Sequence, residues 1–513
     1  MQRKRLPIAR GEGTTGSPSA HAARQLVPVP TPDPNVSRRH SARSRLRRAR
    51  RIELAGRVLA IAIPVIAVGM REDFSYAWIG IALLGWLVSV QSAYARASNT
   101  LRPLGPGAPA VAGAAIGVLI ATSAAFVLDE PQVGLLPLLV CALLVWLLCW
   151  VAELAYRRWA APERRVLIVG WSAVAAELAA GLEGTGYTLV GVAVDAPTVA
   201  VAQTRNSSIS TMSELPGLIA SQQPDIVVIA LERRRLEPLD HLLDAAHEGF
   251  KVLEAPQFFE HVFGRVPVSD LPRAWFLGVL HLYRQPYSAA SKRTFDVVLA
   301  SCALVLTAPL LPLIALLTKT SRGPVLIRQI RIGEHGRPFV LRKFRTMNAE
   351  AEPDGEAVWS TAGDGRVTAV GRVLRAVRLD ELPQLWNILR GEMSIVGPRP
   401  ERPEFIRSLE ARVSFWSRRD LVKPGLTGWA QVRNGYAADS DQALAKLSYD
   451  LWYLRHRSLL VDLAICGQTV GVLLRGHVHM TQAAEQTSAE PTTVTESASG
   501  NGTVQSAVPS QLP

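Results

Sequence analysis

The sequence predicts a multidomain membrane protein with three folded parts: an N-terminal bundle of four transmembrane helices, a Rossmann-like α/β module, and a C-terminal mainly α (α+β) domain. Three observations support this prediction. The chain has 513 residues, which is too long for one ordinary domain. Long apolar runs crowd residues 52–156. Beyond them, strand-like apolar segments alternate with helical ones, which is typical of a parallel sheet.

The formal net charge of +13 indicates an anionic partner, such as nucleic acid, anionic lipid or a phosphorylated substrate. The four cysteines form no Cys-x-x-Cys pair and no spacing typical of a metal site. Most of them lie within apolar runs, where cysteine behaves as a small hydrophobic residue. We therefore expect no disulfide framework, which fits a protein whose soluble parts face the cytosol.

Both ends of the chain are expected to be disordered tails, at residues 1–51 and 481–513, because small and polar residues dominate them. Arginines are dense between residues 38 and 51. Such a run suits a nucleic-acid arm or the cytoplasmic flank of a membrane span, and we favour the flank because a span follows directly. No apolar core begins near Met1, so a cleaved signal peptide is not expected.

Four transmembrane helices are expected within residues 52–158, and each is close to the ~20 residues that a helix needs to cross the hydrocarbon core. Their predicted spans are 52–70, 76–97, 108–128 and 133–156. Arginines precede the first span, lie in the second loop and follow the fourth span, whereas the first and third loops carry acidic residues. Both ends of the bundle should therefore face the cytoplasm. No ionisable group lies at the middle of a span, so the bundle is interpreted as an anchor.

Residues 164–280 are expected to form the α/β module. Buried strands are predicted at 165–170, 225–230 and 251–253, with helices at 172–182 and 241–248. The dinucleotide-binding fingerprint is incomplete, because only Gly170 remains where several glycines are needed. We therefore favour a structural or regulatory module over one that binds NAD.

The apolar run from Phe295 to Leu317 is long enough to span a bilayer, yet Pro309 and Pro312 interrupt it. Cations flank both of its ends. Since both ends should prefer the cytoplasm, we expect the run to enter the membrane and turn back. A plain fifth crossing is the alternative.

Two adjacent carboxylates, Asp380 and Glu381, stand just ahead of Pro383, which fits the first turn of a helix. Acidic residues at a helix N-terminus are commonplace, because they complement the helix dipole. Here, however, arginines lie on both sides of the pair, at 372, 375 and 378 and again at 390, 399 and 402. A pair of carboxylates flanked by basic residues suits phosphoryl chemistry on an anionic substrate.

A series of ordered stretches in the C-terminal region resembles one known family. They are Lys292-Arg293-x-x-Asp296, Gly323-Pro324-Val325, Gln329-x-Arg331-x-Gly333, Lys343-Phe344-Arg345-Thr346-Met347, Asp380-Glu381-Leu382-Pro383-Gln384, Gly397-Pro398-Arg399-Pro400, Lys423-Pro424-Gly425-Leu426-Thr427-Gly428, and Tyr449-Asp450 with Tyr453. On these residues, 288–480 resembles the bacterial sugar transferase domain, the catalytic unit of the monotopic phosphoglycosyl transferases. The whole chain resembles the larger polyprenyl-phosphate hexose-1-phosphate transferases that start exopolysaccharides, in which four spans and a Rossmann-like module precede that unit.

The resemblance implies a two-step transfer on the cytoplasmic side of the bacterial inner membrane. Asp380 would be the nucleophile that takes a phosphosugar from a nucleotide-sugar, and polyprenyl (undecaprenyl) phosphate would then accept it. Glu381 would hold Mg²⁺. The positions implied to bind phosphate or substrate are Lys343, Arg345, Arg375, Arg399 and Lys423. The bent apolar run, about 293–318, would be the family's re-entrant helix, in contact with membrane lipid.

Some positions depart from the family's commonest pattern. Gly365 stands where a proline is usual, Ala369 where a basic residue is frequent, and Arg378 where a small hydroxyl residue often sits. The stretch after Gln431 is variable in the family, so the sugar cannot be carried over. UDP-glucose and UDP-galactose are the expected donors, and an N-acetylated sugar is left open.

Two other functions stay open at this point. One is a catalytically inactive, membrane-anchored nucleotide-binding or regulatory protein, which the intact Asp380-Glu381 pair disfavours. The other is an NAD-dependent sugar-modifying enzyme, which the missing glycines of the module disfavour. We expect no nucleic-acid partner, and a homo-oligomer is left open.

Overall fold

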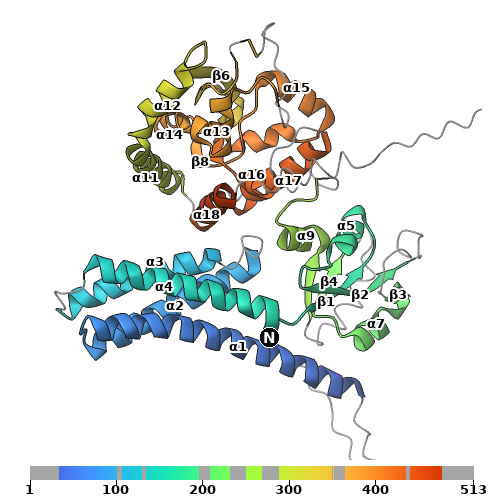
Figure 1. Ribbon diagram of the computed structural model, residues 1–513. Coiled ribbons are helices and arrows are strands. Elements are labelled where there is room, and N and C mark those ends of the chain that lie inside the picture. The colour runs from blue at the N-terminus through green and yellow to red at the C-terminus, as the bar shows by residue number, and fades with distance from the viewer. Residues whose placement is uncertain are drawn as a thin grey trace, which may run out of the picture.

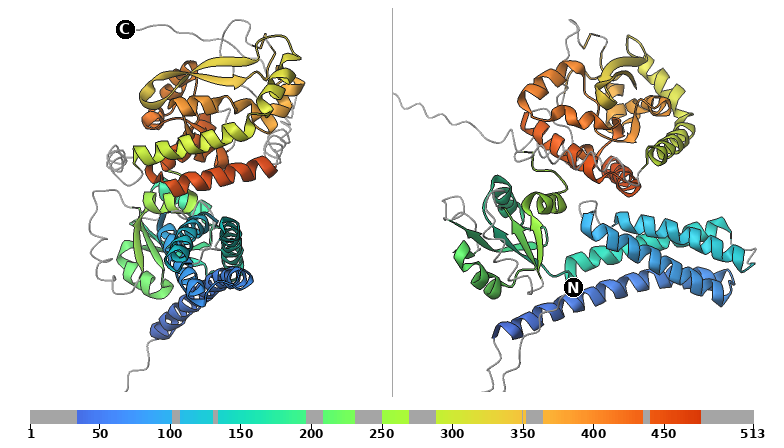
Figure 2. Two further views of the ribbon diagram at one scale, coloured as in Figure 1. Left: turned by 90° about the vertical axis from the view of Figure 1, so that its left-hand side faces the viewer. Right: turned by 180° about the vertical axis from the view of Figure 1, so that it is seen from behind.

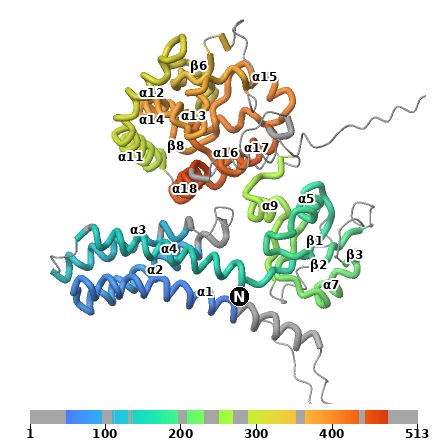
Figure 3. The backbone as a smooth tube through the Cα atoms, viewed as in Figure 1, coloured from blue at the N-terminus to red at the C-terminus, as the bar shows by residue number. Residues whose placement is uncertain are grey.

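The computed structural model describes residues 34–100, 107–129, 134–195, 208–230, 250–268, 288–348, 350–351, 364–434 and 440–475. The expected helix at 241–248, the end of the module at 269–280 and the tail from residue 481 lie outside these ranges. One expectation is wrong: residues 34–51 belong to a helix and not to a disordered tail. Figure 3 traces the chain from the helical bundle through the α/β module to the C-terminal domain.

The bundle consists of four helices: α1 (Pro34–Arg71), α2 (Tyr76–Thr100), α3 (Gly107–Val127) and α4 (Leu135–Ala155) (Figure 1). All four are long and apolar enough to cross a membrane, which confirms the expected number of spans. The helices α2 and α3 pack closely at a glycine, since a Cβ on Gly117 would lie 1.9 Å from the indole of Trp86. The indole nitrogen of Trp86 donates to the carbonyl oxygen of Ala114 at 3.1 Å.

Charged side chains enter the bundle near the middle of α1 and the C-terminal end of α4. The guanidinium of Arg57 lies 2.8 Å from the carboxylate of Glu153 on α4, and both residues are buried. Glu53 also contacts Arg57, one turn earlier on the same helix. Because an unpaired charge is costly in an apolar interior, this pair joins the first and last helices of the bundle.

The α/β module contains one parallel sheet of five strands, in the order β3-β2-β1-β4-β5, which confirms the predicted parallel sheet. Its elements are β1 (Arg164–Val169), α5 (Ala173–Gly181), β2 (Tyr187–Val194), β3 (Ser208–Thr211), α7 (Leu215–Gln222), β4 (Ile226–Ile229), β5 (Lys251–Glu254) and α9 (Ala255–Phe263). Val166 and Ile168 of β1 pack with α5 and α9, whereas Leu167 and Val169 pack with α7. Helices therefore cover both faces of the sheet.

The C-terminal domain is mainly helical and carries two small two-stranded sheets (Figure 1). Its first part comprises α11 (Ala289–Thr307), α12 (Leu310–Lys319), β6 (Leu326–Ile332), β7 (Pro338–Phe344), α13 (Ala369–Ala376), the 3₁₀ turn η7 (Leu379–Glu381) and α14 (Gln384–Arg390). Its second part comprises β8 (Ser394–Val396), α15 (Pro403–Arg412), the 3₁₀ helix η8 (Trp416–Leu421), β9 (Gly425–Thr427), α16 (Trp429–Asn434), α17 (Ser440–His456) and α18 (Leu459–Arg475). The helices α11 and α12 are bent by 65° at a break that includes Pro309.

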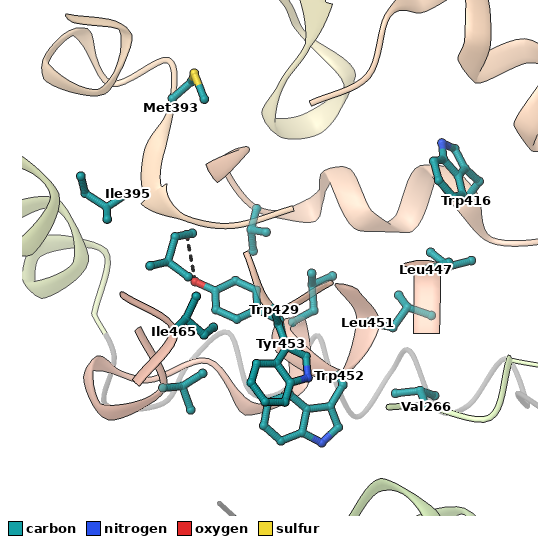
Figure 4. Close-up of a cluster of buried hydrophobic side chains, with 14 of the residues drawn as sticks. Val266, Met393, Ile395, Trp416, Trp429, Leu447, Leu451, Trp452, Tyr453 and Ile465 are labelled. Atoms are coloured by element: carbon teal, nitrogen blue, oxygen red, sulfur yellow. Dashed lines mark hydrogen bonds between the residues drawn. The ribbon is translucent and has the colours of Figure 1, made fainter. Parts of the chain in front are cut away.

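The core of this domain is built around aromatic side chains (Figure 4). The rings of Trp429 and Trp452 stack with centroids 5.0 Å apart, and the hydroxyl of Tyr453 donates to the carbonyl oxygen of Val396 at 3.0 Å. The segment after α9 also enters this core. The indole nitrogen of Trp429 donates to Gly264, and Val266 is buried in the same cluster. The α/β module is thus tied to the domain that follows it.

Candidate active site

The expected carboxylate pair lies in the short turn η7, between α13 and α14. Arg378 begins this turn in the left-handed backbone region (φ 54°), which is uncommon for a residue other than glycine. Leu379 and Leu382, on either side of the pair, pack into a hydrophobic cluster beneath it. Asp380 and Glu381 are only 7% and 6% exposed. The turn therefore holds two neighbouring carboxylates in a largely buried position, just before Pro383 and α14.

A hairpin brings the first cations to this pair. Strands β6 and β7 are antiparallel, with Arg331 opposite Phe339 and Ile327 opposite Lys343. Because side chains alternate between the faces of a strand, Arg331 and Lys343 lie on the same face. Burial, together with the nearby Arg331 and Arg399, lowers the pKa of Lys343 to about 8, although the negative charge of Asp380 acts in the opposite direction. Lys343 is therefore part of the carboxylate site.

Two of the expected arginines also belong to the site. Both terminal nitrogens of Arg399 donate to the same oxygen of Glu381, Oε1, at 3.0 Å. Arg375 comes from α13, and its Nε donates to the hydroxyl of Thr346 at 2.8 Å. Thr346 follows the β7 strand, so α13 is oriented by the same stretch that supplies Lys343.

The positive charges around Asp380 only partly offset the effect of burial on its pKa. Burial and the neighbouring Glu381 raise the pKa of Asp380 to about 6, while Lys343, Arg399 and Arg375 lower it. A carboxylate with this pKa is still mostly ionised near neutral pH. It is therefore a poorly solvated anion surrounded by cations, an arrangement that suits attack on a phosphorus atom.

The structure does not bring all the expected residues together. Arg345 is only 3% exposed, and its guanidinium donates to the carbonyl oxygens of Thr318, Ser321 and Pro324 at 2.8 to 3.1 Å. It therefore stabilises the turn after α12 and does not face the carboxylates. This corrects its predicted role as a phosphate-binding residue. The physical reason is that β7 ends at Phe344, so the side-chain alternation that orients Lys343 does not extend to Arg345.

Lys423 lies at the opposite end of α14 from the carboxylates. Its Nζ is 3.7 Å from the position that a Cβ on Gly391 would take, and Gly391 ends α14. The seven residues of this helix span about 10 Å, and the carboxylates precede its first residue. The structure thus separates Lys423 from the site formed by the three expected cations Lys343, Arg375 and Arg399 and the two acids.

The Lys292-Arg293-x-x-Asp296 stretch connects α11 of the bent helix pair to α14, the helix that follows the carboxylates. Arg293 donates to the carbonyl oxygens of Ile388 and Leu389 at 2.6 Å, which satisfies the C-terminal end of α14. Asp296 accepts hydrogen bonds from Ser394 and from the backbone nitrogen of the next residue. Lys292 lies 2.6 Å from Asp462 on α18, and Figure 2 shows α11 and α18 side by side.

Comparison with known proteins decides the family. A family model described as bacterial sugar transferase matches residues 287–476. The chain is also 45% identical, over 186 residues, to a UDP-glucose:undecaprenyl-phosphate glucose-1-phosphate transferase of Caulobacter vibrioides; the match covers 36% of this chain and 69% of that protein. The chain belongs to the bacterial sugar transferase family. The resemblance seen in the sequence motifs is thereby confirmed.

Longer relatives of the sugar transferase domain match only in part. A UDP-N-acetylgalactosamine-undecaprenyl-phosphate N-acetylgalactosaminephosphotransferase of Aeromonas hydrophila is 39% identical over 226 residues, 44% of this chain and 52% of its own length. A UDP-glucose:undecaprenyl-phosphate glucose-1-phosphate transferase of Escherichia coli K12 is 42% identical over 199 residues, 37% of this chain and 42% of its own length. The aligned part of the chain therefore spans about half of these relatives.

Sequence reasoning missed Arg331 as a member of the sugar transferase site. Its Nη1 donates to the carbonyl oxygen of Pro400 at 3.2 Å, and burial lowers its pKa to about 10. Arg331 stands within one of the matching stretches, so the residue itself was visible. Its proximity to Lys343 depends on the register of the β6–β7 hairpin, which the sequence does not display.

The carboxylate site offers few protein ligands for a metal ion. Among the described residues, no group of three or more His, Cys, Asp or Glu side chains could hold one. A Mg²⁺ ion that binds together with substrate phosphates needs only one or two protein carboxylates. Both donors of Arg399 converge on Oε1 of Glu381, and no hydrogen bond within the described part of the chain engages its Oε2. Glu381 therefore fits a shared protein–phosphate metal site.

Proposed function

We propose that this protein transfers a sugar 1-phosphate from a nucleotide-sugar to undecaprenyl phosphate and so begins the synthesis of a cell-surface glycan. The observation that carries the proposal is the buried carboxylate pair Asp380–Glu381, surrounded by Lys343, Arg375 and Arg399, in a bacterial sugar transferase domain. The names of the relatives support the reaction class, and they include both a glucose and an N-acetylgalactosamine transferase. We expect a UDP-hexose as donor.

The proposed reaction has two displacement steps at one phosphorus atom. A carboxylate oxygen of Asp380 attacks the sugar-bearing phosphorus of the donor, and the bond to the bridging oxygen of the diphosphate breaks. The nucleoside monophosphate leaves with that electron pair, and the phosphosugar remains on Asp380. An oxygen of undecaprenyl phosphate then attacks the same phosphorus. This step releases the Asp380 carboxylate and yields undecaprenyl-diphosphate sugar.

The surrounding side chains would bind and orient the donor. Lys343, Arg375 and Arg399 supply positive charge around Asp380, which offsets the repulsion between an anionic nucleophile and phosphate oxygens. Glu381 would hold a Mg²⁺ ion, which when bound supplies further positive charge against the diphosphate. Arg399 forms an ion pair with Glu381. It would therefore lie close to the donor diphosphate when Glu381 holds the metal ion, and its guanidinium could donate to the phosphate oxygens.

We further infer that the site lies at the cytoplasmic face of the bacterial inner membrane. The bent pair α11–α12 exposes apolar side chains close to its break, where Val305 and Leu306 are 74% and 78% exposed. Such a surface favours lipid over water. Cations at both ends of the pair support a re-entrant path that keeps both ends in the cytoplasm. The strand order and the helices on both sheet faces support a Rossmann-like module.

Cysteine-accessibility labelling tests the re-entrant path. Cysteines are placed at Ser288, before α11, and at Ser321, after α12, one at a time in a variant without the native cysteines. We expect a membrane-impermeant thiol reagent to label both positions from the cytoplasmic side. Labelling of the two positions from opposite sides would show a fifth crossing instead.

The reaction is tested with the full-length protein in detergent, Mg²⁺, radiolabelled UDP-sugars and undecaprenyl phosphate. We expect wild-type protein to form a lipid-linked product and release UMP, and Asp380→Asn to do neither. A matched control is Asp195→Asn, an exposed aspartate of the α/β module, which should behave as wild type.

With donor alone, mass spectrometry should find a phosphosugar on the wild-type peptide that contains residue 380. Active protein that never carries this adduct would exclude the covalent step. Absence of product with every UDP-sugar would exclude the proposed function itself.

A further inference from the structure

The backbone that carries Arg399 is held by an unusual set of contacts. Three consecutive carbonyl groups each accept a hydrogen bond, one from η8 and two from β6. Arg399 accepts from Nη2 of Arg419 at 2.8 Å, Pro400 from Nη1 of Arg331 at 3.2 Å, and Glu401 from the backbone nitrogen of Ile332 at 3.0 Å. This segment is therefore fixed between η8 and β6.

The group that holds Arg399 is itself embedded in buried charge. Arg419 is 2% exposed, and its Nη2 lies 2.8 Å from Oδ2 of Asp450 on α17. Its Nη1 lies 3.7 Å from the carboxylate of Glu401, which Lys446 also contacts. The Glu401 carboxylate completes the network by lying 3.8 Å from Arg331. Two carboxylates and three cations from four parts of the fold thus meet directly behind the Arg399 segment.

Stability alone does not explain so many buried charges. Taking charged groups out of water costs several kcal/mol per ion, and apolar replacements of buried ion pairs are often equally stable. In addition, Nε of Arg419 is buried without a hydrogen-bond partner among the described residues. A network that is imperfect as a source of stability, yet placed behind a substrate-binding side chain, is better explained by what it positions.

The pairing of Arg399 with Glu381 requires such positioning. Both terminal nitrogens of Arg399 reach one carboxylate oxygen at 3.0 Å, a forked geometry that a backbone shift of about 1 Å would break. The side chain can adopt it only if its own backbone stays fixed relative to η7. The hydrogen bond from Arg419 restrains that backbone at the residue that carries the guanidinium.

We propose that Arg419, fixed by Asp450 and Glu401, is a positioning residue that sets the place of Arg399 beside the reacting carboxylates. Arg419 contacts neither Asp380 nor Glu381 in any described interaction, so it acts through Arg399. This inference rests on the proposed function. It also gives a role to the Tyr449-Asp450 stretch, which the sequence motifs single out and the proposed reaction does not use.

The test is a double-mutant cycle on the full-length protein with Arg399→Ala and Arg419→Lys. Lysine keeps the charge of arginine but lacks the planar fork that contacts Asp450, Glu401 and a carbonyl together. We expect Arg419→Lys to lower kcat/KM for UMP release by about 10- to 100-fold, as outer contacts of active sites typically do. In the Arg399→Ala background the same change should cause almost no further loss.

Donor affinity provides a readout besides turnover. Equilibrium binding of UDP-sugar, measured without acceptor, should weaken in Arg419→Lys but not further in the double variant. The control is Arg412→Lys, an exposed arginine on α15 outside the network, which should change neither quantity. A full, additive loss from Arg419→Lys when Arg399 is already absent would overturn the proposal.

The cycle separates this inference from the proposed function. If wild-type protein releases no UMP from any donor, the proposed function fails; an additive cycle in active protein overturns only the positioning role. If Arg419→Lys does not fold, the same cycle is made with Asp450→Asn, which keeps the shape of the side chain and removes the charge behind Arg419. A smaller loss of a few fold is then expected, again only when Arg399 is present.

Discussion

The buried charge of Lys343 should lower the stability of the folded protein, although activity requires that charge. Its pKa in the folded protein is about 8, compared with the usual 10.5, chiefly because of burial. At about 1.4 kcal/mol per tenfold change, keeping this amine charged costs about 3 kcal/mol as an upper bound. Because the folded pKa lies below the unfolded one, the cost is full below about pH 8. It disappears as the pH rises towards 10.5.

Replacing Lys343 by methionine removes this cost and keeps a side chain of similar length. We expect Lys343→Met to unfold at a higher temperature than wild type at pH 7, in detergent, and to lose this advantage near pH 10. Its activity should be lost, because no cation then faces Asp380 from β7. The matched control is Lys251→Met, an exposed lysine on β5, for which the unfolding temperature should barely change.

The same group sets the alkaline limb of activity. We expect kcat/KM for the free enzyme to rise through about pH 6, as Asp380 ionises, and to fall above about pH 8, as Lys343 loses its proton. Lys343→Arg should move the alkaline limb upward, since arginine keeps its proton. The reasoning is refuted if the limb does not move, or if Lys343→Met is destabilised equally at both pH values.

Three further outcomes are expected. Glu381→Gln should lose most activity and show a weaker dependence on Mg²⁺ concentration; an unchanged metal titration would exclude Glu381 as the metal ligand. Arg345→Met should lower the unfolding temperature, since it leaves carbonyl groups of the turn after α12 unsatisfied, whereas the donor KM of the folded fraction should stay near wild type. A raised donor KM in Arg345→Met would instead indicate that Arg345 binds phosphate. Arg57→Met should destabilise the bundle by about 3 to 5 kcal/mol, because it leaves the buried charge of Glu153 without a partner. The double variant with Glu153→Gln should recover most of this stability. If it recovers none, the pair does not couple α1 to α4.

Local patterns in the sequence predicted much of the architecture. The four spans depend only on length and hydropathy, which act within one segment, and they agree with the helices in number and approximate bounds. The parallel sheet follows from apolar runs that alternate with helical segments. The break at Pro309 follows from the missing backbone donor of proline. The start of the first helix could not be predicted this way, because an arginine-rich segment carries no hydrophobic period.

The sequence by itself determined the carboxylate pair, the family and most of the cations that meet at the site, since these are contiguous motifs of recognisable chemistry. Only the tertiary structure decided which cations face Asp380. It assigned Arg345 to a structural turn, placed Lys423 at the far end of α14, and brought Arg331 and Arg419 to the Arg399 segment. The physical reason is that a side chain's partners depend on strand register and helix packing. These join residues that are far apart along the chain, and no local motif encodes their distance.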